Sequence, residues 1–304
     1  MTGDKNTAPS DPDAEGSVFR ADAGSLYVVA TPIGNLRDLT LRALDILRGV
    51  DIIAAEDTRV TSTLLARYGV TTRPRALHRH NEARQADAIV DALAGGRSVA
   101  LVSDAGTPGI SDPGARLVRA VRAAGHRVVP IPGATAIATA ISAAGLVAER
   151  FAFIGFLPLH AKARREWLAT IAPWPIALVF YEAPHRIADT LAELAQGLDG
   201  RRTLTVAREL TKTFESIATV PLADAAKWLA MDANRARGEF VLIVDAPVGD
   251  TASNAFAADA DRLLAALLEE LPPARAARVA AAVTRLPRDA LYARALTLRA
   301  GSGE

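Results

Sequence analysis

The chain has no cysteine among its 304 residues, which excludes disulfide bonds, thiolate metal sites and a cysteine nucleophile. No apolar run reaches the roughly 18 residues that a membrane-spanning helix needs. The polar segment 1–24 lacks the basic and then apolar order of a secretory signal peptide, so we predict a disordered tail there. Together these absences predict a cytoplasmic protein.

Two glycine-rich nucleotide signatures are also missing. Neither G-x-x-x-x-G-K nor G-x-G-x-x-G occurs in the chain, which argues against a P-loop nucleotidase and a standard dinucleotide-binding domain. A nicotinamide-dependent oxidoreductase would need such a fingerprint. We expect no metal site, because His78 and His80 are close in sequence but no third or fourth ligand accompanies them.

An excess of one charge is likewise absent, since the net charge is +1. The basic residues are nevertheless concentrated near the end of the chain. Segment 271–300 carries six arginines against the single acid Asp289, and such a patch is typical of a nucleic-acid footprint or of a solvated helical face. The arginines are Arg275, Arg278, Arg285, Arg288, Arg294 and Arg299.

Short apolar runs alternate with segments of helical periodicity, which predicts an α/β fold with crossover connections and a largely parallel sheet. We predict two α/β/α domains with mainly parallel sheets and a cleft between them, followed by a small C-terminal helical module. The predicted strands are 26–30, 52–55, 99–103, 128–131, 151–156, 176–181, 204–208 and 240–245. The predicted helices are 40–48, 61–68, 82–93, 114–124, 134–144, 162–170, 186–196 and 222–230.

Changes in composition divide the chain. We predict an N-terminal domain over 25–147 and a second α/β domain over 148–248, with the break near 145–150. The stretch 247–254 has the composition of a linker. The remainder, 255–300, has no strand pattern and predicts about three helices, in the size of a helix-turn-helix module.

Three turns of small residues follow predicted strands in the first domain, at 31–35, 103–108 and 130–136. Ligands bind beyond the carboxyl ends of strands in open α/β sheets, so these turns predict one shared pocket. Gly106 allows the backbone to approach a ligand closely, and we expect Asp104 to contact that ligand. For Asp112, a helix-capping role is preferred.

Charged clusters follow other strands, at 54–59, 77–82, 180–186 and 208–215. In the cluster 77–82, a cap by Asn81 with plain surface polarity and a role in substrate binding are both compatible with the residues. In the cluster 208–215, an interdomain ion pair at Arg208–Glu209 is an alternative to a catalytic role.

The order of these motifs resembles one known family. The motifs are TPIGNL (31–36), AAEDTR (54–59), LHRHNE (77–82), LVSDAGTPGISDPG (101–114), PGATA (132–136), GFLP (155–158), FYEAPHR (180–186), ARELTKTFE (207–215) and GEFVLIV (238–244). They resemble the small-subunit ribosomal RNA methyltransferases of the tetrapyrrole-methylase-like (class III) superfamily, over residues 26–244. The tail 271–298 is similar to the C-terminal helical module of those enzymes.

The resemblance implies a homodimer that uses S-adenosylmethionine, and methylation of the ribose 2′-hydroxyl of a cytidine in the decoding region of 16S ribosomal RNA. It also implies the residues of the cofactor site, which come from the small-residue turns and the start of the second domain. These residues are Pro32, Asp104, Ala105, Gly106, Thr107, Ser111, Thr135, Ala136, Phe156 and Leu157.

A ribose hydroxyl is a poor nucleophile at neutral pH, so the site needs a base or a cation that stabilises the developing alkoxide. Glu56 and Asp57 are candidates for the base or an orienting group, and Lys212 and Arg208 for the cation. The expected RNA contacts, from the ribosomal RNA or the small ribosomal subunit, are Arg59, His78, His80, Arg186, Arg275, Arg278 and Arg288.

Two other functions share part of this pattern. A methyltransferase that acts on tetrapyrroles would share the turns but would not need the basic C-terminal module. A non-catalytic RNA-binding protein would keep the basic tail and need no methyl-donor pocket.

Overall fold

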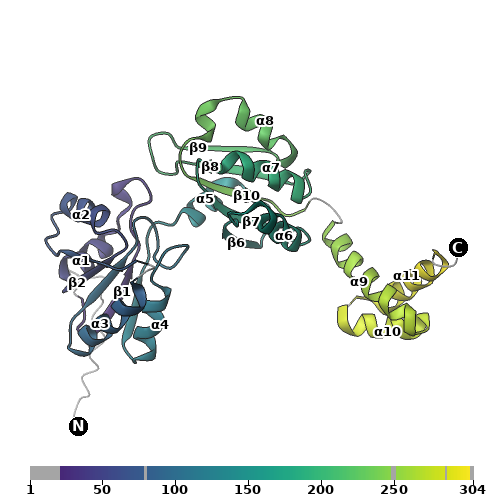
Figure 1. Ribbon diagram of the computed structural model, residues 1–304, viewed down its shortest axis with the longest axis horizontal. Helices are drawn as coiled ribbons and strands as arrows, with labels where there is room; N and C mark the ends of the chain where they lie inside the picture. Colours follow the sequence, from purple (N-terminus) through teal and green to yellow (C-terminus); the bar gives the residue numbers. More distant parts are fainter. Residues whose placement is uncertain (1–20, 79–80, 248–250, 285, 302–304) are drawn as a thin grey trace, which may run out of the picture. The chain divides into compact units, whose positions relative to one another are not determined.

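The computed structural model describes residues 21–78, 81–247, 251–284 and 286–301. The chain divides into two compact units (Figure 1). The first runs to Thr139 and includes Glu209–Glu215, and the second holds Ala140–Arg208 and the chain from Ser216 onward. The division falls within helix α5 (Ala136–Ala144), ahead of the predicted break at 145–150. In the described ranges, no helix has the length and apolar character that crossing a membrane requires.

The first unit is built on a five-stranded sheet in the order β3-β2-β4-β1-β5, and every pairing in it is parallel. This confirms the predicted parallel sheet. The short edge strand β3 was not predicted, because three residues that start with Pro74 make no apolar run. The strands are β1 (Ser25–Val29), β2 (Ile52–Ala55), β3 (Pro74–Ala76), β4 (Val99–Val102) and β5 (Arg127–Ile131).

Helices cover both faces of this sheet (Figure 1). Alternate residues of a strand point to opposite faces, and β4 divides accordingly between two cores. Ala100 and Val102 pack with α1 (Leu41–Gly49) and α2 (Thr58–Arg67). Val99 and Leu101 pack with α3 (Glu82–Ala94) and α4 (Ala115–Ala123). A short 3-10 helix, η1 (Leu36–Asp38), precedes α1.

The second unit has a five-stranded sheet in the order β6-β7-β10-β8-β9. Only β6 and β7 pair in parallel, and the other three pairings are antiparallel. The α/β class is therefore confirmed, but the prediction of a mainly parallel sheet is wrong here. Residues 209–215 join β8 to β9 and are too few for a crossover helix, so these strands pair antiparallel. The strands are β6 (Phe151–Phe156), β7 (Ala177–Glu182), β8 (Thr203–Arg208), β9 (Ser216–Pro221) and β10 (Phe240–Val244).

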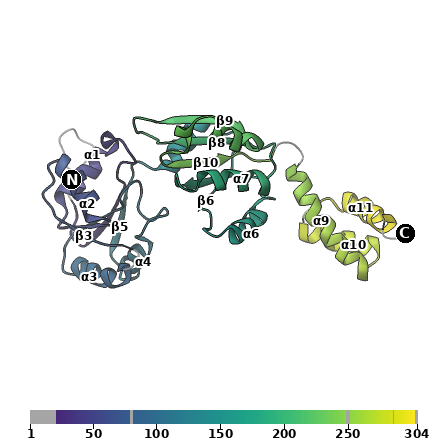
Figure 2. The same ribbon diagram turned by 45° about the horizontal axis from the view of Figure 1, so that its top comes forward.

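The helices that lie between β6 and β10 in the sequence share one core cluster, and Figure 2 shows α6 and α7 beside the strands of this sheet. In β7, Leu178 and Phe180 belong to this cluster, whereas Val179 between them does not. The helices that contribute to it therefore pack on the same face of the sheet. They are α6 (Ala161–Ile171), α7 (Ile187–Gly197) and α8 (Ala225–Ala230), and the 3-10 helices η2 (Leu222–Asp224) and η3 (Ala233–Ala236) flank α8.

Three helices follow β10, in agreement with the helical pattern of the sequence. They are α9 (Thr251–Glu270), α10 (Pro273–Thr284) and α11 (Arg288–Gly301). Their buried alanines and leucines, among them Leu264, Ala277 and Leu291, form a core of their own.

The N-terminal tail was predicted over 1–24, and residues 1–20 lie outside the described part. Residues 21–24 contact the first unit: Gly24 N–H donates to the carbonyl of Arg97 at 3.2 Å, and Arg127 forms an ion pair with Asp22 at 2.7 Å. Residues 21–24, which were predicted as part of the tail, therefore belong to the first unit.

Candidate functional site

The three turns of small residues meet at the carboxyl edge of the first sheet. The backbones of Thr31 and Gly106 exchange two hydrogen bonds, at 2.9 and 3.0 Å. The Thr107 hydroxyl donates to the carbonyl of Ala134 at 3.2 Å. Residues from turns after β1, β4 and β5 are thus joined directly, as the sequence pattern predicted.

Two glycines make this close approach possible. Gly106 has φ 75°, a backbone conformation that strains any residue with a Cβ. At Gly133, a Cβ would lie 2.9 Å from the Cβ of Ala30. Pro32 is buried beside the Thr31–Gly106 bridge. A ligand at this edge would therefore meet mainly backbone and small side chains.

Asp104 links this cluster to β2. Its Oδ1 accepts a hydrogen bond from the backbone N–H of Asp57 at 2.9 Å, and its side chain is exposed. Glu56 and Asp57 follow β2 directly, so both predicted acids lie at the same edge of the sheet. Asp104 is thereby held beside the segment that carries them.

Asp57 and Arg59 form an ion pair with each other. The Asp57 carboxylate caps α2 by accepting from the N–H of Arg59 at 2.8 Å, and it pairs with the Arg59 guanidinium at 2.6 Å. These hydrogen bonds lower the pKa of Asp57 to about 2. A carboxylate with so low a pKa is a weak proton acceptor near neutral pH, so Glu56 is the better candidate for the base.

Segment 209–215 packs against the turn after β1. The N–H of Asn35 donates to the Thr211 hydroxyl at 2.9 Å. A Cβ on Gly34 would lie 2.5 Å from Cγ of Lys212 and 2.7 Å from the Thr211 hydroxyl oxygen. Glu209 and Thr211 have φ of 51° and 66°, an uncommon conformation that costs free energy and recurs at functional sites.

The two predicted cations have different surroundings. Lys212 Nζ donates to the Glu209 carboxylate at 2.8 Å. The Arg208 guanidinium donates to the hydroxyl of Ser216 at 3.1 Å and to the carbonyl of Arg237 at 3.2 Å. The ion pair of this segment is therefore Lys212–Glu209, and not Arg208–Glu209 as the sequence suggested. Arg208 braces β8 and β9, whereas Lys212 lies beside the turn at Gly34.

Glu82 has a role that the sequence did not reveal. It is buried at the start of α3, and its Oε1 accepts from the N–H groups of Gly114, Arg116 and Leu117 at 2.9–3.2 Å. Glu82 therefore caps α4 from another helix. The predicted cap by Asp112 is wrong, because α4 begins at Ala115 and its N-cap position is Gly114.

Asn81 stands at the N-cap position of α3 without a side-chain bond to that helix. Its amide oxygen instead accepts from the N–H of His78 at 2.8 Å, and its amide nitrogen donates to the carbonyl of Ala76 at 3.1 Å. The suggested cap by Asn81 is therefore wrong. His78 is half-buried in this loop, and His80 lies outside the described residues.

In the second unit, Arg186 supports the turn after β6. Its Nη2 donates to the carbonyl of Leu157 at 2.7 Å, and its Nε lies 3.4 Å from the buried carboxylate of Glu182. These bonds occupy the guanidinium, so the predicted phosphate contact by Arg186 is not supported. Leu157 is buried and Phe156 is exposed. A register shift in the pairing of β6 with β7 precedes Gly155 and redirects the chain into this turn.

The remaining predicted residues lie at element ends or on helices. Ser111 has φ 65°, Thr135 directly precedes α5, and Ala136 is the first residue of that helix. Arg275 and Arg278 are exposed on α10, and Arg288 is exposed at the start of α11. Of the other C-terminal arginines, Arg294 forms an ion pair with Asp261 at 2.6 Å, and Arg285 lies outside the described residues.

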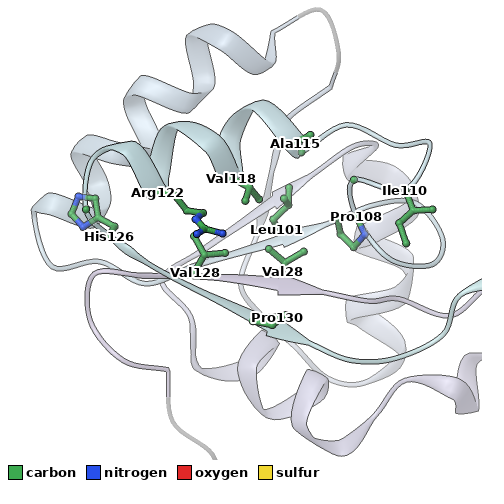
Figure 3. A pocket seen from close by; sticks show the side chains of 13 residues that line it. Val28, Leu101, Pro108, Ile110, Ala115, Val118, Arg122, His126, Val128 and Pro130 are labelled. Atoms are coloured by element: carbon green, nitrogen blue, oxygen red, sulfur yellow. The ribbon is translucent and has the colours of Figure 1, made fainter. Parts of the chain in front are cut away.

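A cavity of about 770 Å³ lies between α4 and strands β1, β4 and β5 (Figure 3). Val28, Leu101 and Val128 are among the apolar side chains that line it, with Arg122 at the end of α4 and His126 just before β5. In the connection from β4 to α4 it touches Pro108, Gly109, Ile110 and Gly114. Because it offers few polar groups to orient a ligand, we place the candidate site at the joined turns and not in this cavity.

No group of three or more His, Cys, Asp or Glu side chains in the described ranges is arranged to hold a metal ion.

The contact of the turn at Gly34 and Asn35 with Thr211 and the capping by Glu82 were both missed from the sequence. Asn35 and Thr211 are separated by 176 positions, and no local pattern links them. Glu82 resembles an ordinary first-turn acid, and nothing in its neighbours indicates that it faces α4.

Two family models match the chain. Residues 25–226 match the model of tetrapyrrole (corrin/porphyrin) methylases. Residues 254–299 match the model described as the RsmI C-terminal HTH domain. Together these ranges cover most of the residues described above.

Similar curated proteins carry the name ribosomal RNA small subunit methyltransferase I. The protein of Vibrio cholerae is 50% identical over 267 residues, which cover 88% of this chain and 92% of that protein. The protein of Escherichia coli O157:H7 is 49% identical and covers 90% of this chain and 95% of its own length. Among solved structures, the methyltransferase CobJ matches with a TM-score of 0.56 and 24% identity over 75% of this chain and 98% of its own. That likeness supports the fold.

Proposed function

The chain belongs to the tetrapyrrole (corrin/porphyrin) methylase family, and on that premise we propose that it methylates small-subunit ribosomal RNA with S-adenosylmethionine as methyl donor. The observation that carries the proposal is the junction of three strand-end turns, together with a C-terminal helical module of the type found in the ribosomal RNA enzymes. The finer proposal is transfer to the ribose 2′-hydroxyl of a cytidine in the decoding region of 16S ribosomal RNA.

The residues at the turns fit such a donor. Gly106 allows the turns after β1 and β5 to meet the turn after β4, and the exposed Asp104 carboxylate can accept hydrogen bonds from hydroxyl or amino groups. The Thr31–Gly106 bridge and the Thr107 hydroxyl hold the turn after β4 against its neighbours, and we expect Pro32, beside that bridge, to contact the donor. We expect Ala105, Ser111, Thr135, Ala136, Phe156 and Leu157 to complete the donor site. When bound, S-adenosylmethionine supplies an electrophilic methyl group.

The chain must supply the position of the nucleophile and a place for its proton. Holding the hydroxyl oxygen at attacking distance accounts for much of the rate enhancement in such displacements. Glu56 is our candidate acceptor of the proton, because it directly follows β2 at the edge of the sheet where the turns meet. Lys212, beside the turn at Gly34, is our candidate for stabilising negative charge on the oxygen.

The exposed arginines of the C-terminal helices, Arg275, Arg278 and Arg288, are our candidates for contacts with the RNA backbone. Such contacts fix position and carry no sequence information. The predicted homodimer and cytoplasmic location are part of the same proposal, and light scattering of the purified protein tests the dimer.

The test is transfer of labelled methyl from S-adenosylmethionine to small ribosomal subunits purified from cells that lack this gene, followed by mapping of the modified nucleotide. We expect one 2′-O-methylated cytidine in the decoding region. Donor binding without transfer to any subunit preparation would overturn the RNA substrate and favour a tetrapyrrole. No donor binding would favour a non-catalytic RNA-binding protein.

Two variants separate the donor site from the RNA site. Asp104→Ala is expected to weaken donor binding in calorimetric titration. Arg278→Ala combined with Arg288→Ala is expected to weaken subunit binding in a salt-dependent way, with donor affinity unchanged. A loss of donor affinity in the arginine variant would contradict this division.

A further inference from the structure

A second hollow in the first unit, with a volume of about 670 Å³, lies next to the turn after β1. Three segments form it: residues 34–37, the end of α2 at 67–68, and residues 211–213. From these lining residues and the surrounding hydrogen bonds, we infer that it binds the sugar-phosphate backbone of the RNA strand that carries the target nucleotide. This inference rests on the proposed function, and it specifies where on the first unit the RNA strand binds.

The charge of the hollow is the first argument. Three of its lining residues, Arg37, Arg67 and Lys212, are cationic, and no lining residue is acidic. The side chains of Thr211 and Thr213 add hydroxyl groups. Arginine and hydroxyl groups are the usual partners of phosphate oxygens.

Two neighbouring acids are engaged with residues that line the hollow. The Glu209 carboxylate accepts from Lys212 Nζ at 2.8 Å, and a Glu215 oxygen accepts from the backbone N–H of Thr211 at 2.5 Å. Lys212 is therefore partly neutralised by Glu209. The charge that remains for a phosphate comes mainly from Arg37 and Arg67.

The exposure of these two arginines favours a nucleic-acid strand over a small phosphorylated ligand. Both Arg37 and Arg67 are exposed at the surface. An enclosed small phosphorylated molecule would be held by buried charges, whereas a strand that passes over the surface meets exposed ones. Several cations along an open groove are typical of backbone binding to single-stranded nucleic acid.

The hollow is also held rigidly. The Tyr68 hydroxyl donates to the carbonyl of Leu36, and the N–H of Asn35 donates to the Thr211 hydroxyl at 2.9 Å. Because Gly34 has no Cβ, Lys212 can lie against this turn. A bound phosphate would thus lie next to Lys212, which the proposed mechanism assigns to the reacting oxygen. The hollow would align the strand with the reaction.

The experiment compares Arg37→Ala, Arg67→Ala and the double variant with wild type. Each is tested for binding to small ribosomal subunits lacking the modification, across a range of salt, and for steady-state methyl transfer. Arg119→Ala, an exposed substitution on α4, is the matched control. Calorimetric titration with S-adenosylmethionine checks that the donor site is intact.

We expect the double variant to bind subunits about tenfold more weakly near 0.1 M salt. The slope of log K against log salt should be shallower by about 0.7 for each arginine removed. KM for the subunits should rise while kcat stays close to wild type. Arg37→Lys with Arg67→Lys should keep the salt slope, because the charge remains.

Three results overturn the inference. Unchanged affinity and salt slope in the double variant, with wild type active, would remove the hollow from the RNA path while leaving the proposed function intact. Loss of donor affinity would assign the hollow to the donor site. A wild-type protein that neither binds nor methylates subunits would overturn the proposed function and this inference together.

Discussion

Removal of the Glu82 side chain should loosen the start of α4 more than any change on the exposed surface of α3. Its Oε1 accepts from three backbone N–H groups, and Glu82 is only 6% exposed. Each buried donor that loses its partner costs about 1–3 kcal/mol. Water can reach the exposed Arg116 end of the helix, so we expect a total cost of about 3 kcal/mol for Glu82→Ala, within the range of one to two unmade bonds.

Native-state hydrogen exchange measures this loss of stability directly at the backbone amides that Glu82 caps. A loss of about 3 kcal/mol corresponds to roughly 100-fold faster exchange. We expect that acceleration at the amides of Gly114, Arg116 and Leu117 in Glu82→Ala. Glu82→Gln keeps one acceptor oxygen and should accelerate exchange less, by about tenfold.

Asp87→Ala, an exposed substitution on the same helix, is the matched control and should leave exchange at these amides unchanged. Wild-type exchange at Arg116 and Leu117 in the Glu82→Ala protein would refute the capping role. Equal acceleration throughout the first unit would show a general loss of stability instead of a local one.

Three further predictions concern side chains whose partners are now known. The carboxyl of Asp57, measured by NMR titration, should have a pKa of about 2 against an ordinary 3.8; its pairing with Arg59 therefore contributes stability above pH 3.8 that is lost as pH falls toward 2, and a pKa above 3.8 would restore Asp57 as a base. Arg186→Ala should weaken donor binding about tenfold in calorimetry with subunit affinity unchanged, because it removes the support of the Leu157 carbonyl; an RNA-binding defect alone would contradict this. Arg202 is fully buried and donates to the carbonyls of Asp245 and Ile176. In urea denaturation, Arg202→Met should lower the free energy of unfolding of the second unit by about 2 kcal/mol. An unchanged urea midpoint of unfolding would argue against a structural role.

Local patterns in the sequence predicted much of the fold. Continuous apolar runs such as 99–102 predicted strands that are buried on both faces, and the small-residue turns that follow them predicted a shared ligand edge. Both predictions rest on features within a few residues of each other: the period of hydrophobicity and the turn chemistry of Gly and Pro. Two of the edge strands were not predicted, because β3 has only three residues and four of the six β9 residues are exposed without an apolar pattern.

The roles of individual charged residues depended on the tertiary structure. The sequence indicated that Arg186, Asp57 and Glu82 lie in functional motifs, but it did not reveal their partners. Arg186 supports a turn 29 positions away, and Glu82 caps a helix whose N-cap residue lies 32 positions later. A side chain's charge is encoded locally, whereas the group that it meets is set by how the elements pack. The sequence by itself therefore determined most elements and the small-residue turns at one edge of the first sheet, and only the packed structure decided which partner each charged side chain meets.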